Sequence, residues 1–279
     1  MSNNIIYNMN YDEYRNHNFL AKSDLDLINI NPSMYSWKKN APKVKSKNKS
    51  LDFGTLFHKC VLENEEYNSE YVKTLYWKDS QTSLELLDKW GVNVEEGLKE
   101  PDIVKHFEKA VSKGLCGYTL EDIDKCASMQ QSLKAHPYYE ELFYSGESEV
   151  SYFVKDFNSS LGCKCRVDFI NNDRNIIIDL KTTSRPAELD KSIIQYRYDV
   201  QASFYIDVVK AVTGIDYRFI FCFVSTSVLY DSYPVYFVEL NKSQLESARG
   251  KYRTNLESYM QYISEDNISF INIDVKKWW

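Results

Sequence analysis

Three segments in the second half of the chain alternate apolar and polar residues, which is the period of a half-buried strand. They span residues 149–155, 164–170 and 175–181. Turn-forming residues separate them, Asn158-Ser159-Ser160 in the first gap and Asn171-Asn172-Asp173-Arg174 in the second. Because short turns of this kind join neighbouring antiparallel strands, we predict a three-stranded antiparallel meander.

Helical and strand patterns alternate after the meander. We predict a helix over residues 199–213, followed by Gly214, a residue type suited to the position after a helix. Two strands follow, over 217–226 and 232–240, and then a long helix over 243–262. The resulting order αβββαββα predicts an α/β fold with a central mixed β-sheet flanked by helices.

The first half of the chain reads as helices and loops. We predict a short helix over 24–30, with Ser23 as its N-cap and Pro32 beyond its end. Further helices are predicted over 54–63 and 120–135. A helical N-terminal elaboration therefore precedes the sheet.

Length and composition fit a globular protein. The chain has 279 residues, of which 43% are hydrophobic and 27% are charged, so it can bury a substantial core. We expect one domain over residues 1–279. Residues 1–145 would form its helical N-terminal part, and residues 146–279 its core.

The chain is acidic overall, with 34 Lys and Arg against 40 Asp and Glu, a net charge of −6 and a pI near 5.4. This balance alone argues against a broadly basic nucleic-acid-binding surface. Residues 38–49, however, hold six lysines, Pro42 and no acidic residue, so we predict a loop from Trp37 to Leu51. The loop is either a solvated segment or a contact to a phosphate backbone, and in the second case its candidate DNA-binding residues are Lys43, Lys45 and Lys47.

The sequence predicts neither a membrane span nor a zinc ribbon. The longest wholly apolar stretch, residues 219–224, is far short of the roughly 20 residues that a span needs. Residues 1–10 lack the basic and apolar regions of a secretory signal, so we expect a cytoplasmic protein without a membrane partner. The six cysteines contain no Cys-x-x-Cys pair, so we expect free thiols and no Fe–S cluster.

The predicted meander brings carboxylates together. A turn centred between Asn158 and Ser159 sets Glu149 opposite Asp168, and a turn centred between Asp173 and Arg174 sets Asp168 opposite Asp179. Directly opposed Cβ atoms lie about 4.5–5.5 Å apart. Lys181 follows Asp179 by two residues and therefore projects from the same face of its strand.

Like charges on neighbouring strands repel each other, so this cluster needs something that offsets the repulsion. Mg²⁺ or Mn²⁺ would do so, with Asp168 and Asp179 as ligands. Lys181 would then orient or deprotonate an attacking water, or neutralise charge on a phosphate. The alternative is a solvated strand face that carries acids by chance. Because the opposite face is consistently apolar, we favour the metal site.

Three short motifs carry a resemblance to a known family. Asp168 followed by Asp179-Leu180-Lys181 resembles the signature of the PD-(D/E)xK nucleases. Gly54-Thr55-Leu56-Phe57-His58 resembles the Gly-x-x-x-His motif of RecB-type and RecE-type nucleases, and Gln201-Ala202-Ser203-Phe204-Tyr205 their Gln-x-x-x-Tyr motif. From about Tyr11 onward the chain is similar to the RecE-type (exodeoxyribonuclease VIII-like) exonucleases. Val167 stands where the signature has proline, a position that offers no ligand atom.

The resemblance implies roles for individual residues. It implies a metal site formed by Asp168, Asp179, Leu180, His58 and Glu149. It implies Lys181 as the catalytic lysine, with Gln201 and Tyr205 turned toward the active site from one helix face. Taken without these partners, His58 could be a core histidine, and Gln201 and Tyr205 could simply cap the core. Further candidate DNA contacts are Arg166, Arg185 and Arg197.

The leading functional hypothesis is a Mg²⁺-dependent exodeoxyribonuclease that digests linear double-stranded DNA from its ends, with Mn²⁺ as a substitute. The resemblance implies 5′→3′ polarity, 3′ single-stranded tails and a ring-shaped homo-oligomer. It also implies a RecT-like single-strand annealing protein as partner in phage-type recombination, in a bacterial or phage-infected cell. The alternatives are an endonuclease or single-strand-specific nuclease of the same fold, and a non-catalytic module that binds DNA ends.

Overall fold

The computed structural model describes residues 4–42, 49–67, 99, 102, 105, 120–155, 157 and 160–265. Its centre is a six-stranded sheet with the strands in sequence order. The strands are β1 (Asn4–Ile6), β2 (Glu147–Val154), β3 (Cys163–Asn171), β4 (Ile176–Thr183), β5 (Arg218–Ser225) and β6 (Val235–Glu239). All neighbours are antiparallel except β4 and β5, which are parallel. The predicted mixed sheet and its antiparallel meander are therefore confirmed.

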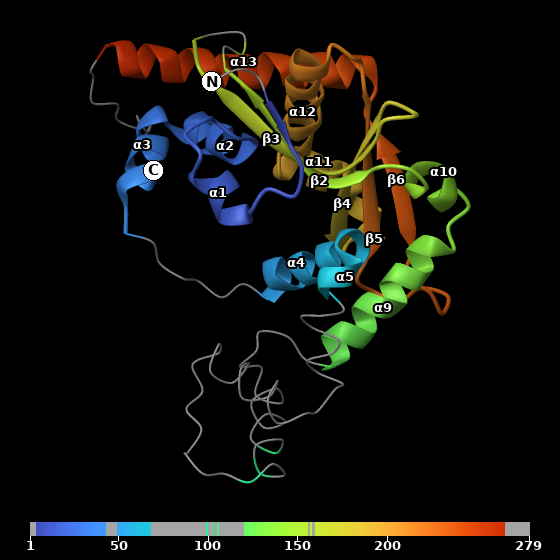
Figure 1. The fold of residues 1–279 in the computed structure, drawn as a ribbon. Coiled ribbons are helices and arrows are strands. Elements are labelled where there is room, and N and C mark those ends of the chain that lie inside the picture. Colours follow the sequence, from blue (N-terminus) through green and yellow to red (C-terminus); the bar gives the residue numbers. More distant parts are fainter. Residues whose placement is uncertain are drawn as a thin grey trace, which may run out of the picture.

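Helices cover both faces of the sheet (Figure 1). On one face, α12 (Tyr198–Thr213) packs against β2, β3 and β5, and α13 (Lys242–Ser264) packs on α12. On the other face, α4 (Lys49–Leu62) contacts β3 and β4, and α9 (Leu120–Lys134) contacts β5. Each face has its own cluster of buried apolar side chains, so β4 lies between two cores. This position of β4 decides which helices can reach its side chains.

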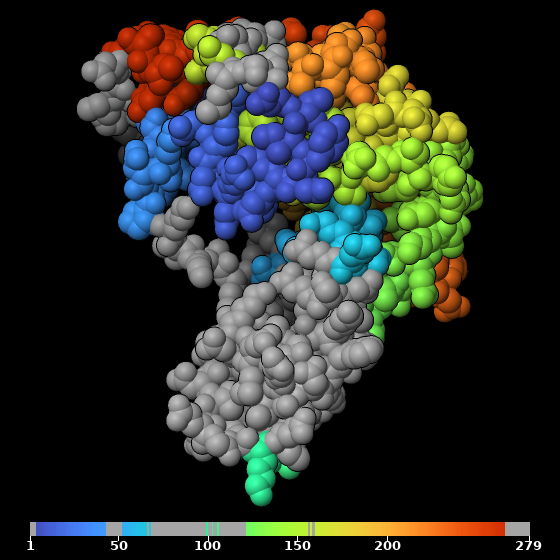
Figure 2. Space-filling model, in the orientation of Figure 1, coloured from blue at the N-terminus to red at the C-terminus, as the bar shows by residue number. Residues whose placement is uncertain are grey.

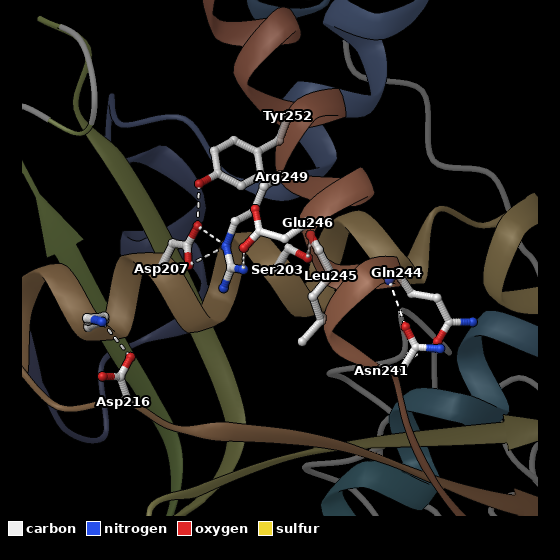
Figure 3. A network of polar contacts seen from close by, with 10 residues as sticks. Ser203, Asp207, Asp216, Asn241, Gln244, Leu245, Glu246, Arg249 and Tyr252 are labelled. Carbon is white, nitrogen blue, oxygen red and sulfur yellow. Dashed lines mark hydrogen bonds and ion pairs between the residues drawn. The ribbon is translucent and has the colours of Figure 1, made fainter.

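A polar network fixes α13 on α12 (Figure 3). The guanidinium of Arg249 donates from Nε to both carboxylate oxygens of Asp207, at 3.0 and 2.9 Å, and the Tyr252 hydroxyl donates to the same carboxylate at 2.5 Å. Ser203 adds a hydrogen bond from its hydroxyl to the carbonyl of Leu245 at 2.9 Å. These contacts with α13 hold α12 in place, and they thereby position the residues on the side of α12 that faces the sheet.

The N-terminal part contains short helices: α1 (Tyr11–Asn16), α2 (Lys22–Ile30), α3 (Pro32–Asn40) and α5 (Asn64–Tyr67). It also contributes β1, which the polar N-terminal sequence did not indicate, so this part is not purely helical. In Figure 2 the dark blue atoms of the N-terminal residues spread across the face turned toward the viewer, above the cyan atoms of α4 and α5. No helix in the described ranges is long and apolar enough to cross a bilayer.

Two local predictions in this part are wrong. Ser23 is not an N-cap, because α2 begins one residue earlier and the Asp24 carboxylate accepts a hydrogen bond from the Ala21 backbone at 2.9 Å. The loop predicted from Trp37 to Leu51 is helical at both ends, in α3 and α4. Proline is favoured in the first turn of a helix, and Pro32 begins α3 here. The positions of Lys43, Lys45 and Lys47 lie outside the described residues.

Most other elements match their predictions. The three meander strands begin and end within about two residues of the expected positions, and α9 and α12 within one. Gly214 follows α12 with a φ of 75°, the left-handed conformation expected after a helix end. The helix expected from residue 54 begins at Lys49 instead. Shorter elements, α10 (Tyr139–Phe143) and α11 (Leu189–Gln195), had no clear sequence pattern.

Candidate active site

The strand register places the predicted carboxylates as expected. In β2 and β3, Ser148 pairs with Phe169 and Val150 with Val167, which sets Glu149 opposite Asp168. In β3 and β4, the pairing of Phe169 with Ile178 follows the predicted register too. This pairing covers only Phe169–Asn171 of β3, so the strands separate where Asp168 and Asp179 would face each other.

Asp168 occupies the point at which β3 and β4 separate. Its Oδ2 accepts a hydrogen bond from the backbone N–H of Leu180 at 2.8 Å. The side chain therefore bridges the gap that the diverging backbones leave. This bond fixes the orientation of the carboxylate beside His58 and Glu149.

His58, Glu149 and Asp168 form a cluster with the dimensions of a metal site, since one potential ligand atom from each lies within 4.8 Å of the others. The Nδ1 atom of His58 is 3.6 Å from Oδ2 of Asp168, and its Nε2 is 2.6 Å from the carbonyl oxygen of Leu180. Because a carbonyl oxygen only accepts, Nε2 is the donor in the second contact, and Nδ1 is the ring nitrogen that faces the carboxylates. A metal-ligating histidine commonly donates its other N–H to a backbone carbonyl in this manner.

α4 positions His58 by burying its neighbours. Leu56 and Phe57 are fully buried in the core cluster beside β4. His58 follows them on the helix and keeps a side-chain exposure of 25%, with its ring directed at β3 and β4. The ring is thus a partner of the strand carboxylate rather than a histidine enclosed by apolar residues.

Asp179 lies beside this cluster and is almost completely buried. Lys181, which shares its strand face, contacts Oδ2 of Asp179 with its ammonium group. Gln201 of α12 donates from Nε2 to the other oxygen, Oδ1. Gln201 therefore contacts a strand carboxylate from α12, and both oxygens of Asp179 have partners on the chain itself.

Glu149 has an unusual backbone. Its φ of 55° lies in the left-handed region, which costs a residue with a side chain about 1–3 kcal/mol. Arg166 holds the resulting side-chain position, because its Nε donates to Oε2 of Glu149 at 2.6 Å. A second nitrogen of Arg166 donates to the carbonyl of Met9 at 2.9 Å. The guanidinium that was predicted to contact DNA thus ties Glu149 to the N-terminal segment.

Burial and neighbouring charges together change the acidities of the groups in this site. Burial raises the pKa of Glu149 to about 7, and the Asp168 charge adds to this effect while Arg166 and His58 oppose it. Burial raises the pKa of Asp179 to about 6 against the opposing charge of Lys181. Burial lowers the pKa of Lys181, but the carboxylates of Asp179 and Asp168 outweigh it and hold that pKa above its ordinary value. Lys181 is therefore an ammonium group in this arrangement.

A divalent cation fits this donor set. The cluster combines two carboxylates with an imidazole nitrogen, and the third carboxylate and the Leu180 carbonyl are adjacent. Oxygen ligands suit Mg²⁺ and Mn²⁺, and a bound cation would offset both the burial of Glu149 and the Asp168 charge, which together raise the pKa of Glu149. In this arrangement the Leu180 carbonyl accepts from His58, and its role as a ligand stays a prediction.

Other predicted site residues lie elsewhere. Tyr205 packs in the core on Phe219, with ring centroids 6.1 Å apart, and burial raises the pKa of its hydroxyl well above the ordinary value. Arg197 donates to Asn255 at 2.7 Å and contacts Leu25 and Asp26 of α2, so it joins helices. Arg185 is exposed just after β4, where it pairs with Glu188 at 3.4 Å. Of the three arginines, Arg185 is the one open to solvent.

Tyr198 lies beside the site and was not among the residues predicted from the sequence. The ammonium of Lys181 lies 5.2 Å from the centroid of the Tyr198 ring. Tyr198 precedes Gln201 by three residues, so both lie on one face of α12. This spacing was a usable signal, because Gln201 was already expected to face the active site.

Comparisons with known proteins support the fold. A family model described as a PDDEXK-like domain of unknown function matches residues 31–269. A candidate exonuclease from Eubacterium rectale has a TM-score of 0.60 and 12% identity, over 92% of this chain and 86% of that chain. A phage-related exonuclease from Haemophilus somnus 129PT covers 67% of this chain and 95% of that chain at 15% identity, with a TM-score of 0.32. None of the curated proteins matches the sequence.

Proposed function

Because the chain belongs to the family of PDDEXK-like domains, we propose that it is a divalent-metal-dependent exodeoxyribonuclease that hydrolyses linear double-stranded DNA from its ends. The sequence resemblance to the PD-(D/E)xK nucleases is confirmed by this membership. The observation that carries the proposal is the cluster of His58, Glu149 and Asp168 beside the contact between Asp179 and Lys181.

Each polar group of the site has a task in this reaction. His58, Glu149 and Asp168 would hold the cation, with Asp179 next to them. A bound divalent cation polarises a phosphoryl oxygen and makes a water more acidic, which are the two requirements of phosphodiester hydrolysis. Lys181 supplies a positive charge and hydrogen-bond donors that stabilise the negative charge developing on the phosphate.

The surrounding residues keep these groups in place. Gln201 fixes the orientation of Asp179, and the Leu180 N–H fixes Asp168. Arg166 does the same for Glu149. Preorganised groups need no rearrangement when charge develops, so their effect on rate exceeds that of mobile groups. The exposed guanidinium of Arg185, just after β4, is our candidate contact to a DNA phosphate.

Finer parts of the proposal rest on the RecE-type resemblance. They are Mg²⁺ as the resident cation, with Mn²⁺ as a substitute, 5′→3′ polarity and 3′ single-stranded tails. They also include a homo-oligomeric ring and a RecT-like single-strand annealing protein as partner in recombination. We expect this activity in the cytoplasm of a bacterial or phage-infected cell, with Lys43, Lys45 and Lys47 among the DNA contacts.

One assay tests the proposal and its alternatives. Linear duplexes labelled at either end and covalently closed circles are incubated with the wild type or Lys181→Ala, in Mg²⁺ or EDTA. We expect Mg²⁺-dependent shortening of one strand of the linear duplex by the wild type alone. Cleavage of closed circles would favour an endonuclease, and end binding without cleavage would favour a non-catalytic module. Wild-type-like activity in Lys181→Ala would contradict the assigned site.

A further inference from the structure

Lys181 has a contact besides Asp179 that no motif assigns. Its ammonium lies 5.2 Å from the centroid of the Tyr198 ring, within the roughly 6 Å over which a cation is attracted to an aromatic face. The Lys181 side chain is only 18% exposed. Because water competes little at such a site, the attraction is stronger than at an open surface.

The ring of Tyr198 is itself held firmly. It packs on Phe221 and Phe223 of β5, with centroids 5.8 and 6.2 Å away. Tyr198 opens α12, and the preceding residue, Arg197, has a left-handed φ of 53° and a side chain bonded to Asn255 of α13. Both the backbone and the ring of Tyr198 are therefore fixed by elements outside β4.

A second lysine supports the same arrangement. Lys22 of α2 donates to the carbonyl of Tyr196 at 2.7 Å and pairs with Asp26 at 2.8 Å. Its ammonium lies 6.0 Å from the centroid of the Tyr198 ring. Lys22 thus anchors the backbone just before Tyr198, and the ring of Tyr198 lies near two ammonium groups, those of Lys22 and Lys181.

Asp179 alone would not place the Lys181 ammonium. A lysine side chain has four rotatable carbon–carbon bonds, and Asp179 lies on the same strand, two residues away. One carboxylate partner leaves the ammonium free to pivot about that contact. A second contact from α12, on a different element, removes much of this freedom.

We propose that Tyr198 is a positioning residue for Lys181, which it holds through the face of its aromatic ring. This inference rests on the proposed nuclease function, in which Lys181 stabilises charge on the scissile phosphate. It concerns the ring and not the hydroxyl. Phenylalanine at this position should therefore preserve the positioning of Lys181, whereas an aliphatic residue such as leucine should not.

Three variants separate positioning from packing. Tyr198→Phe keeps the ring, Tyr198→Leu removes it, and Tyr236→Leu removes another partly buried tyrosine that packs on the same core. We expect Tyr198→Leu to lower kcat about tenfold with KM within twofold of the wild type, the size that a partly desolvated cation–π contact can carry. Tyr198→Phe and Tyr236→Leu should keep kcat within twofold. Unchanged kcat in Tyr198→Leu, or equal loss in both Tyr198 variants, would overturn the inference.

A measurement independent of activity distinguishes this inference from the nuclease proposal. In ¹H–¹⁵N spectra of lysine ammonium groups, the Lys181 signal is identified by its loss in Lys181→Arg. We expect that signal to move downfield in Tyr198→Leu, because the shielding by the ring face is lost, and to stay near its wild-type position in Tyr198→Phe. An unmoved signal in a folded Tyr198→Leu protein would contradict the ring contact. Absence of DNA cleavage by the wild type would contradict the nuclease proposal alone.

Discussion

Glu149→Gln should stabilise the metal-free protein at alkaline pH while weakening its response to metal. The change keeps the shape of the side chain and removes its charge. Burial raises the pKa of Glu149 from the ordinary 4.5 to about 7, so the folded protein resists ionisation of this group more than the unfolded chain does. Folding therefore carries an energetic cost at every pH at which Glu149 ionises in the unfolded chain.

The pH dependence of this cost has a definite sign. Below about pH 4.5 the carboxyl is protonated in both states, and it costs nothing. Between pH 4.5 and 7 only the unfolded chain ionises, so stability falls as pH rises. Above pH 7 the full cost is present, about 3 kcal/mol for this change in pKa. The opposing charge of Arg166 is already part of this pKa, and a glutamine amide oxygen can still accept from Arg166, so Glu149→Gln should gain about the same amount.

Urea unfolding in EDTA measures this effect at pH 5 and pH 8. We expect Glu149→Gln to exceed the wild type in unfolding free energy at pH 8, and the difference to shrink at pH 5. Added Mg²⁺ should stabilise the wild type more than the variant, because the variant lacks a ligand charge. A variant less stable than the wild type at pH 8 would contradict this prediction, since the ionised carboxylate would then stabilise the fold through Arg166 instead of destabilising it.

Three further predictions concern other groups. Asp168→Asn should lose both metal-dependent DNA cleavage and the rise in Tm on addition of Mg²⁺, and wild-type behaviour in either measurement would contradict the assigned ligand. Substitution of Lys43, Lys45 and Lys47 by Gln should weaken DNA binding and flatten its salt dependence, whereas an unchanged slope would identify a solvated segment. Burial lowers the pKa of Lys164 to about 8, so its cost to folding is full below pH 8 and disappears as pH rises toward 10.5. The stability of the wild type relative to Lys164→Met should therefore increase between pH 7.5 and 9.5 in urea unfolding, and a constant difference would contradict it.

The sequence was sufficient where local patterns determine geometry. Turn residues and alternating strands predicted that Glu149 lies opposite Asp168, because a hairpin has few possible registers. The spacing of Asp179 and Lys181 along one strand predicted their shared face, and their side chains are in contact. The two short motifs predicted that His58 and Gln201 would reach the strand carboxylates.

The sequence was insufficient where the contacts depend on packing between distant segments. Arg166 was expected to contact phosphate, but its position beside Glu149 and the carbonyl of Met9 depends on how the N-terminal segment packs on the sheet. The separation of β3 from β4 at Asp168 likewise could not be predicted, because no turn residue or proline marks that position in the sequence. Tyr205 shares a helix face with Gln201, but it lies one turn further along α12, where it packs on Phe219 of β5 instead of the carboxylates.

Crystals of the protein grown or soaked with Mn²⁺ would locate the bound cation through its anomalous scattering. We expect a peak between His58, Glu149 and Asp168, at coordination distances of about 2.0–2.3 Å from their ligand atoms, and loss of that peak in Asp168→Asn. A Mn²⁺ ion bound elsewhere, with this cluster unchanged, would contradict the assignment of these three residues as the metal site.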